Sequence, residues 1–305
     1  MGRYILRRLL WLIPVIFAVT AITFVLMHAV PGGPWSNDRA VSAGVQGKIN
    51  AKFNLNKSVP EQYVDWVVSF AQGDFGPSFR YADRSVNAIV ADGLPKSLWL
   101  GFLAFVVAVA LGIPLGIFAA LGHNKAPDYI STGISVIGIA TPSFVLAILL
   151  VVLFSVVLKW FPTSGWKGPD TWVLPVIALA GYQVAVIARY TRASMLEVTR
   201  KDYVRTAHSK GLQARAVVSR HMIRNALIPV VTILGPIFAF LVTGSFIIET
   251  FFGIPGVGRY YVQGIAGRDY GVIMAMTVIF ALAVAVLNVV VDVLYAFIDP
   301  RIRYS

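Results

Sequence analysis

The sequence predicts an all-α membrane protein with six transmembrane helices, both termini in the cytoplasm, and a small helical extracytoplasmic subdomain between the first two helices. Its 305 residues are 57% hydrophobic and 13% charged, with a mean hydropathy of +0.74. Soluble domains carry about 25% charged residues, which excludes an ordinary soluble enzyme. Two further observations support the prediction, namely a series of uncharged apolar stretches and an uneven distribution of basic residues.

The apolar stretches define the expected spans. A bilayer core of roughly 30 Å needs about 20 apolar helical residues, because an α-helix rises about 1.5 Å per residue. The third stretch is the longest and has Pro142 near its middle, so we expect it to tilt, kink or partly leave the bilayer. The fourth is the shortest, and we expect Arg189 and Arg192 to lengthen it by reaching for the interface. Six stretches without Lys, Arg, Asp or Glu qualify or nearly qualify: Leu9–Val30, Leu98–Leu121, Ile130–Leu158, Trp172–Ala188, Ala226–Ile248 and Gly271–Val291.

The distribution of Lys and Arg predicts the orientation. The formal net charge is +12, from 26 Lys+Arg and 14 Asp+Glu. When both termini are placed on one side, that side carries most of the basic residues of the short loops, including a dense group between Arg189 and Arg224. Short loops rich in Lys and Arg stay in the cytoplasm, so we expect both termini there. The first span follows Arg7 and Arg8 but lacks a cleavage pattern, so we interpret it as a retained span rather than a secretory signal.

The predicted spans divide the chain into four ranges. Residues 1–30 are the cytoplasmic N-terminus with the first span, and residues 31–97 are the extracytoplasmic subdomain. Residues 98–298 hold spans two to six, including a cytoplasmic segment at 189–225. Residues 299–305 form a cytoplasmic tail.

The extracytoplasmic range is predicted to be folded. Apolar residues recur at helical spacing from Val41 to Phe53, and Pro60 is suited to open a second helix with an apolar aromatic face. Residues 73–77 have the composition of a turn. A third short helix is expected to begin after Ser85 and to be stopped by Gly93 and Pro95.

The cytoplasmic segment 189–225 is the most basic part of the chain. We predict a short helix capped near Thr199 or Asp202 and ended by Gly211, because glycine readily takes the left-handed conformation that follows a helix. A second amphipathic helix is expected over 214–223. Two such helices that meet at a glycine would form a rigid projection. Alternatively, the segment is an ordinary cytoplasmic loop whose arginines contact lipid headgroups, which would also account for its positive charge.

This segment carries the pattern Asp-Tyr-x-Arg-Thr-Ala-x-x-Lys-Gly-Leu, formed by Asp202, Tyr203, Arg205, Thr206, Ala207, Lys210, Gly211 and Leu212. In this pattern the sequence resembles bacterial ATP-binding-cassette importer permeases of the oligopeptide and dipeptide family. His208 stands where relatives commonly have Arg, and the acidic residue of the broader importer pattern is absent, as is typical of the peptide branch. Residues 73–79 and the long outer segment most resemble the first of the two oligopeptide permease subunits.

The resemblance implies a non-catalytic translocation subunit in the bacterial cytoplasmic membrane. Its implied partners are a second homologous permease that completes a heterodimer, two ATPase subunits and an extracytoplasmic peptide-binding protein, in addition to membrane lipid. The helix from Asp202 to Leu212 would contact an ATPase subunit, with Tyr203 and Val204 as an apolar anchor and Arg205 and Lys210 as a charged rim. ATP and Mg²⁺ would belong to the partner subunits, and no cofactor to this chain.

Enzymatic and nucleic-acid-binding functions find no support in the residues. The chain has no cysteine and four scattered histidines, so we expect no metal site and no catalytic residues. It has no phosphate-binding loop, the nearest fragment being Gly47-Lys48-Ile49. A basic excess on so apolar a chain indicates membrane topology rather than nucleic-acid binding.

The chief alternative is an ion-coupled secondary carrier. Such carriers usually place ionisable residues inside their spans, whereas the six stretches hold only His28 near the end of the first. Glu249 and Asp292 lie at span ends, where each would line the path or pair with a neighbouring subunit or headgroup. The loop with Gly253, Pro255 and Gly256 is a candidate gate, although a glycine-rich segment is first of all a turn.

Two questions stay open from the sequence. Gly112 and Gly116 form a Gly-x-x-x-Gly pair that allows close helix packing, either within the chain or with the partner permease. The resemblance favours oligopeptides as cargo, with dipeptides and nickel chelates as alternatives. The spans carry no paired charges for a peptide's termini, so we expect affinity to reside in the binding protein.

Overall fold

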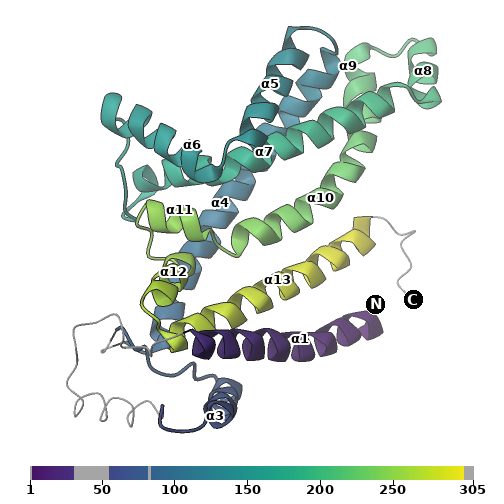
Figure 1. Ribbon diagram of the computed structural model, residues 1–305. Coiled ribbons are helices and arrows are strands. Elements are labelled where there is room, and N and C mark those ends of the chain that lie inside the picture. Colours follow the sequence, from purple (N-terminus) through teal and green to yellow (C-terminus); the bar gives the residue numbers. More distant parts are fainter. Residues whose placement is uncertain (1, 31–54, 82–83, 299–305) are drawn as a thin grey trace. The chain divides into compact units, whose positions relative to one another are not determined.

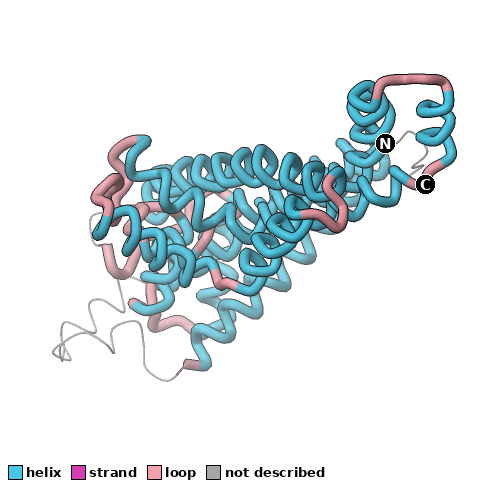
Figure 2. The backbone as a smooth tube through the Cα atoms, turned by 90° about the horizontal axis from the view of Figure 1, so that it is seen from above, coloured by secondary structure: helices cyan, strands magenta, loops and turns pink. Residues whose placement is uncertain are grey.

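The computed structural model describes residues 2–30, 55–81 and 84–298, and these ranges form helices joined by loops, with no β-strand among the described residues (Figure 1). Figure 2 shows that short loops connect most of the helices. The predicted helix at 41–53 and the tail 299–305 lie outside the described residues. The helices are α1 (Gly2–Ala29), α3 (Val59–Ala71), α4 (Val86–Leu121), α5 (Ala126–Ala140), α6 (Ser143–Leu150), the π-helix η1 (Val151–Val157), α7 (Pro169–Thr199), α8 (Asp202–Ser209), α9 (Ala214–Ala216), the π-helix η2 (Val217–Ile223), α10 (Arg224–Val242), α11 (Phe246–Phe251), α12 (Val257–Ala266) and α13 (Tyr270–Ile298).

The membrane spans follow the six apolar stretches. Five continuous helical segments are long and apolar enough to cross a membrane, and α5 with α6–η1 forms a sixth span if the bent pair is counted as one. This pair is bent by 108°. Pro142 lies at the break, where it precedes α6 and cannot donate a backbone hydrogen bond that would continue α5. The kink expected in the third stretch is therefore confirmed.

The chain forms two compact units. One unit comprises residues 1–97 and 255–286, and the other comprises residues 98–254 together with 287–303. We call them the first unit and the second unit. Helices α4 and α13 each contribute residues to both units.

The second unit is built around α7. This helix buries about half of its residues and contacts α5, α6 and α10. Gly112 and Gly116 of α4 lie against α7, since a Cβ atom at Gly116 would stand 2.5 Å from the Ala188 carbonyl oxygen. The Gly-x-x-x-Gly pair thus serves close packing within the chain, one of the two interpretations left open by the sequence.

The first unit contains an aromatic contact between α1 and α3. The Tyr63 hydroxyl lies 2.9 Å from the Thr20 hydroxyl, and its ring contacts the rings of Phe17 and Phe24. Helix α3 begins with Pro60 in its first turn, as predicted. Before it, Ser58 donates its backbone N–H and its hydroxyl to Glu61, and these two bonds lower the pKa of the Glu61 carboxyl.

The third short helix expected in the extracytoplasmic range does not end where the sequence predicts. Ser85 does accept a hydrogen bond from the Ala88 N–H, as a capping residue does, but the helix continues through Gly93 and Pro95 into the second span. Gly93 serves packing instead of termination, because a Cβ atom there would lie 3.2 Å from the backbone carbon of Gly256.

The predicted turn at residues 73–77 is present. Gly73 and Gly76 have φ angles of +79° and +84°, a region that favours glycine. The Asp74 carboxylate accepts the Gly76 N–H at 2.9 Å, and the Asn87 side chain accepts the Phe75 N–H at 2.9 Å. The turn is therefore held both locally and by α4.

Candidate functional site

The candidate site is α8 with the loop that follows it, at the end of α7. Helix α8 begins at Asp202, and Thr199 belongs to the last turn of α7, where its hydroxyl donates to the Met195 carbonyl at 2.8 Å. Of the two caps expected, Thr199 is wrong, and Asp202 is the first residue of α8, preceded by Lys201 at the capping position. Gly211 has φ +76° and donates its N–H to the His208 carbonyl, so the predicted glycine ending is confirmed.

Two side chains of α8 pack against other helices of the same chain. Val204 and Ala207 are 3% and 5% exposed and lie in one apolar cluster with residues of α7, η2 and α10. Because both are spaced for one helix face, burying them fixes the rotation of α8 about its axis. The other buried members of this cluster are Ala120, Met195, Val198, Val217, Met222 and Ala226.

Apolar and basic side chains are exposed on α8 and in the loop that follows it. Tyr203 and Leu212 are 41% and 43% exposed, and the side chains of Arg205 and Lys210 are also exposed. Val204, one of the two residues expected as the apolar anchor, is buried within the chain, so that part of the expectation is wrong. Tyr203, the other, is exposed, as is Leu212.

The charges near α8 are only locally paired. Glu197 and Lys201 form an exposed ion pair at 2.8 Å, and Asp202 lies 3.8 Å from Arg205. Exposed pairs of this kind contribute little to stability, so their side chains stay adaptable. The surface as a whole remains basic.

The second amphipathic helix expected over 214–223 is present as α9 and η2. Val217 and Met222 are buried against α7 and α8, while Arg215 and Arg220 are exposed. The helix continues directly into α10, so this segment connects the candidate site with a membrane span.

A buried ion pair near this site was not predicted from the sequence. Asp128, in the first turn of α5, is 3% exposed and accepts hydrogen bonds from Nε and Nη2 of Arg192 at 2.5 and 2.9 Å. Arg192 is thus paired with Asp128, and α7 continues past the end of the fourth apolar stretch to Thr199. The two residues are 64 positions apart, and no local spacing indicates such a pair.

The proposed gate residues are divided between the two units. Glu249 and Gly253 belong to the second unit, whereas Pro255 and Gly256 begin the second part of the first unit. Gly253 has φ +66° in the turn after α11, and Gly256 is the residue before α12. Asp292 lies in α13, and its side chain lies outside the described residues.

Glu249 is not an interfacial carboxylate. Its residue is fully buried in the second unit, where the carboxylate accepts the Ser245 N–H at 3.2 Å at the start of α11. The expectation that it pairs with a headgroup or a neighbouring subunit is therefore wrong. Burial of Glu249 instead fixes the turn between α10 and α11.

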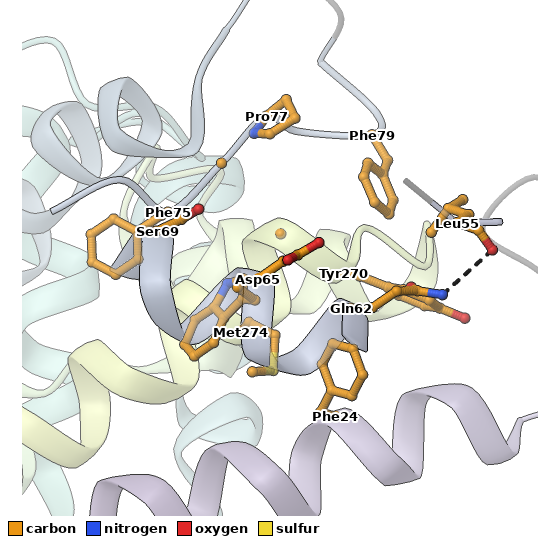
Figure 3. Close-up of a pocket in the computed structure, with 13 residues that line it drawn as sticks. Phe24, Leu55, Gln62, Asp65, Ser69, Phe75, Pro77, Phe79, Tyr270 and Met274 are labelled. Carbon is orange, nitrogen blue, oxygen red and sulfur yellow. Dashed lines mark hydrogen bonds between the residues drawn. The ribbon is translucent and has the colours of Figure 1, made fainter. Parts of the chain in front are cut away.

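The first unit contains a cavity of about 190 Å³ (Figure 3). Aromatic rings from α1, α3, the loop after α3 and α13 line it, and Figure 3 shows Phe24, Phe79 and Tyr270 on one side together with Gln62. Its walls include part of the motif at residues 73–79, which the sequence singled out without predicting a cavity. The lining residues are Phe24, Leu55, Gln62, Asp65, Trp66, Ser69, Phe75, Gly76, Pro77, Phe79, Tyr270, Gly271 and Met274.

A buried carboxylate holds the motif in place. Asp269 is fully buried and accepts hydrogen bonds from the Ser78 hydroxyl and from the Arg80 N–H, the latter at 3.2 Å. The Ser78 hydroxyl in turn accepts the Tyr81 N–H at 2.9 Å. In the described part of the chain, no group of three or more His, Cys, Asp or Glu side chains is placed to hold a metal ion.

These features define a class of membrane protein. Residues 112–304 match the family model "Binding-protein-dependent transport system inner membrane component", and residues 1–101 match its N-terminal counterpart, "Binding-prot-dependent transport system membrane comp, N-term". The chain belongs to this family. It is a multi-pass inner membrane protein and a translocation subunit rather than an enzyme.

Particular relatives are similar over their whole length. The chain is 43% identical over 306 residues, covering 100% of both chains, to the oligopeptide transport system permease protein OppB of Escherichia coli K12. It is also 43% identical over 303 residues to the dipeptide transport system permease protein DppB of Bacillus subtilis strain 168, covering 99% of this chain and 98% of that protein.

Two solved structures share the fold at low sequence identity. A chain of the MetNI methionine ABC transporter in an inward-facing conformation is 16% identical, with a TM-score of 0.59, covering 69% of this chain and 96% of that chain. A chain of an amino acid ABC transporter is 18% identical, with a TM-score of 0.54, covering 68% and 94% respectively. These likenesses concern the fold alone.

Proposed function

We propose that this chain is the permease subunit of an ATP-driven importer and forms half of a translocation pathway for oligopeptides. In this proposal an extracytoplasmic binding protein delivers the peptide, a second homologous permease completes the pathway, and two ATPase subunits bind ATP and Mg²⁺. Both termini and α8 lie in the cytoplasm. Family membership and the full-length similarity to OppB support the proposal.

The observation that carries the proposal is the arrangement of α8. Its buried side seats it on α7 and η2, while Tyr203, Leu212 and basic side chains face outward. A helix so fixed moves as one piece with the helices beneath it, whereas a flexible loop would absorb a displacement. An ATPase subunit that contacts Tyr203 would thereby move the membrane spans when it closes on ATP.

Dipeptides are the alternative cargo. The identity to DppB equals the identity to OppB at 43%, so overall similarity does not separate the two. Competition for uptake between a labelled pentapeptide and unlabelled dipeptides distinguishes them in the same preparation. Oligopeptide specificity predicts that dipeptides compete at least about tenfold less well.

The test is ATP-dependent peptide uptake by proteoliposomes that contain the chain with its partner permease, ATPases and binding protein. Gly211→Pro is incompatible with φ +76° and deforms the end of α8, and Arg205→Glu reverses a charge on its exposed face. Both variants should reduce uptake per ATP hydrolysed, while Glu197→Gln at the end of α7 should not. Uptake driven by an ion gradient without the ATPases would overturn the proposal in favour of a secondary carrier.

We also propose that the loop at residues 253–256 moves during transport. Its turn at Gly253 supports this idea, because a positive φ marks a tight turn that a small change in backbone angles can open. Protease protection of this loop should differ between ATP-free and ATP-bound complexes, and equal protection would refute the idea.

A further inference from the structure

We propose that Asp128 and Arg192 form the joint through which movement of α8 reaches the corner between α4 and α5. We call this corner, residues 122–128, the α4–α5 corner. The inference rests on the proposed function, because it assumes that α8 receives the movement of an ATPase subunit. It assigns a positioning role to two residues outside the surface of α8.

The ion pair between Arg192 and Asp128 is a two-point contact. Two nitrogen atoms of the Arg192 guanidinium donate to the two oxygen atoms of Asp128, at 2.5 and 2.9 Å. A planar two-point contact of this kind restricts rotation as well as distance, which a single-point contact does not. The pair therefore fixes the orientation of α5 relative to α7.

Asp128 also contacts residues of the loop that precedes it. The same carboxylate accepts the Asn124 N–H at 2.9 Å and lies 3.1 Å from Nδ1 of His123. Asn124 has φ +58°, so the loop is a tight turn closed by this carboxylate. A displacement of Arg192 is thereby passed to the whole α4–α5 corner and not to α5 alone.

Helices α4, α5 and α7 pack closely around this ion pair. The Ser131 hydroxyl of α5 donates to the Leu115 carbonyl of α4 at 3.2 Å. On α4, the backbone at Gly116 approaches α7 so closely that a Cβ atom would lie 2.5 Å from Cβ of Thr191, the residue before Arg192. The ends of α4, α5 and α7 thus meet around one ion pair.

Helix α7 connects the ion pair to α8. Arg192 precedes Met195 and Val198 on α7 by one and two turns, and those two residues pack with Val204 and Ala207 of α8. The single helix α7 therefore carries both the residues that pack against α8 and the guanidinium group that binds Asp128. Movement at α8 has a short, rigid path to α5, which leads to the 108° bend before α6.

The first experiment measures peptide taken up per ATP hydrolysed in proteoliposomes of the complete complex. Asp128→Asn keeps the shape of the side chain and removes the ionic joint, and Arg192→Lys keeps the charge but loses the two-point contact. We expect Asp128→Asn to lower this ratio about tenfold with ATP hydrolysis retained, and Arg192→Lys to lie between it and the wild type. Glu197→Gln, which removes an exposed pair on the same helix, is the matched control and should leave the ratio unchanged.

The second experiment uses the absence of native cysteine. Spin labels at Lys125→Cys and Arg200→Cys, both exposed positions, report the distance between the α4–α5 corner and the end of α7. In assembled complexes this distance should stay the same with and without ATP, because the joint makes the two ends move together. With Asp128→Asn it should change or broaden when ATP is added.

The outcomes separate this inference from the proposed function. A label distance that changes with ATP as much in the wild type as in Asp128→Asn overturns the joint, even if uptake requires ATP. An unchanged uptake-to-ATP ratio in Asp128→Asn overturns it as well. If Asp128→Asn does not assemble, the same two measurements on Arg192→Lys decide, whereas uptake that needs no ATP refutes the proposed function itself.

Discussion

The contact between α4 and α10 at Gly101 provides a direct test of the second unit. A Cβ atom at Gly101 would lie 2.2 Å from the Leu241 carbonyl oxygen and 2.6 Å from Cα of Val242. Both are backbone atoms that cannot rotate away, so Gly101→Ala requires the two helices to separate. Overpacking of this kind costs about 1–3 kcal/mol, partly offset by about 0.5–1 kcal/mol gained when alanine replaces a helical glycine.

Gly133 is the matched control, because a Cβ atom there meets no other atom within 4 Å. Gly133→Ala should therefore keep the helix gain of about 0.5–1 kcal/mol without a steric cost. Reversible unfolding of the isolated chain in mixed micelles with increasing SDS gives the free energy of unfolding for both variants. We expect Gly101→Ala to be less stable than Gly133→Ala by about 2 kcal/mol. Equal stabilities would refute the close approach of α4 and α10.

Three further predictions concern particular contacts. Ala207→Glu should detach α8, because an unpaired charge in this apolar cluster costs about 3 kcal/mol, and hydrogen exchange of the α8 amides should speed up accordingly. Ser78→Ala removes a donor from the buried Asp269 carboxylate and should weaken the loop around it by about 1–3 kcal/mol, measured by exchange of the loop amides, and unchanged exchange would contradict the contact. The lowered pKa of Glu61 means that its bond to Ser58 contributes stability above the unfolded pKa of this carboxyl and loses it as the pH falls through the folded value. Amides in the first turn of α3 should therefore exchange faster after acidification, corrected for intrinsic rates, and this extra acceleration should vanish in Glu61→Gln.

The spans and the two short helices of the candidate site were predictable because their signals are local. Uncharged apolar stretches show which segments can cross a bilayer, since every backbone polar group there must be satisfied within its own helix. Gly211 marks the end of α8 for an equally local reason, its positive φ. Pro142 marks the bend in the third stretch, because proline lacks the N–H that a continuous helix needs.

The errors share a different cause. Local sequence predicts a helix end at Gly93, whereas this glycine allows close approach to Gly256, a residue far away in the chain. Local sequence also predicts Val204 as a surface anchor, because sequence spacing does not indicate which face of a short amphipathic helix its own chain covers. Glu249 was expected at an interface because its charge was considered without the fold that buries it.

The helical class, the spans and the kink could be predicted from the amino-acid sequence, because each depends on residues within a few turns of one another. The burial of Val204 and Ala207, the approach of Gly112 and Gly116 to α7, and the pairing of Asp128 with Arg192 depend on the folded chain. These contacts depend on how separate helices approach. Local periodicity does not encode that approach, since a helix presents several faces and the pairing of faces is fixed only when the whole chain packs.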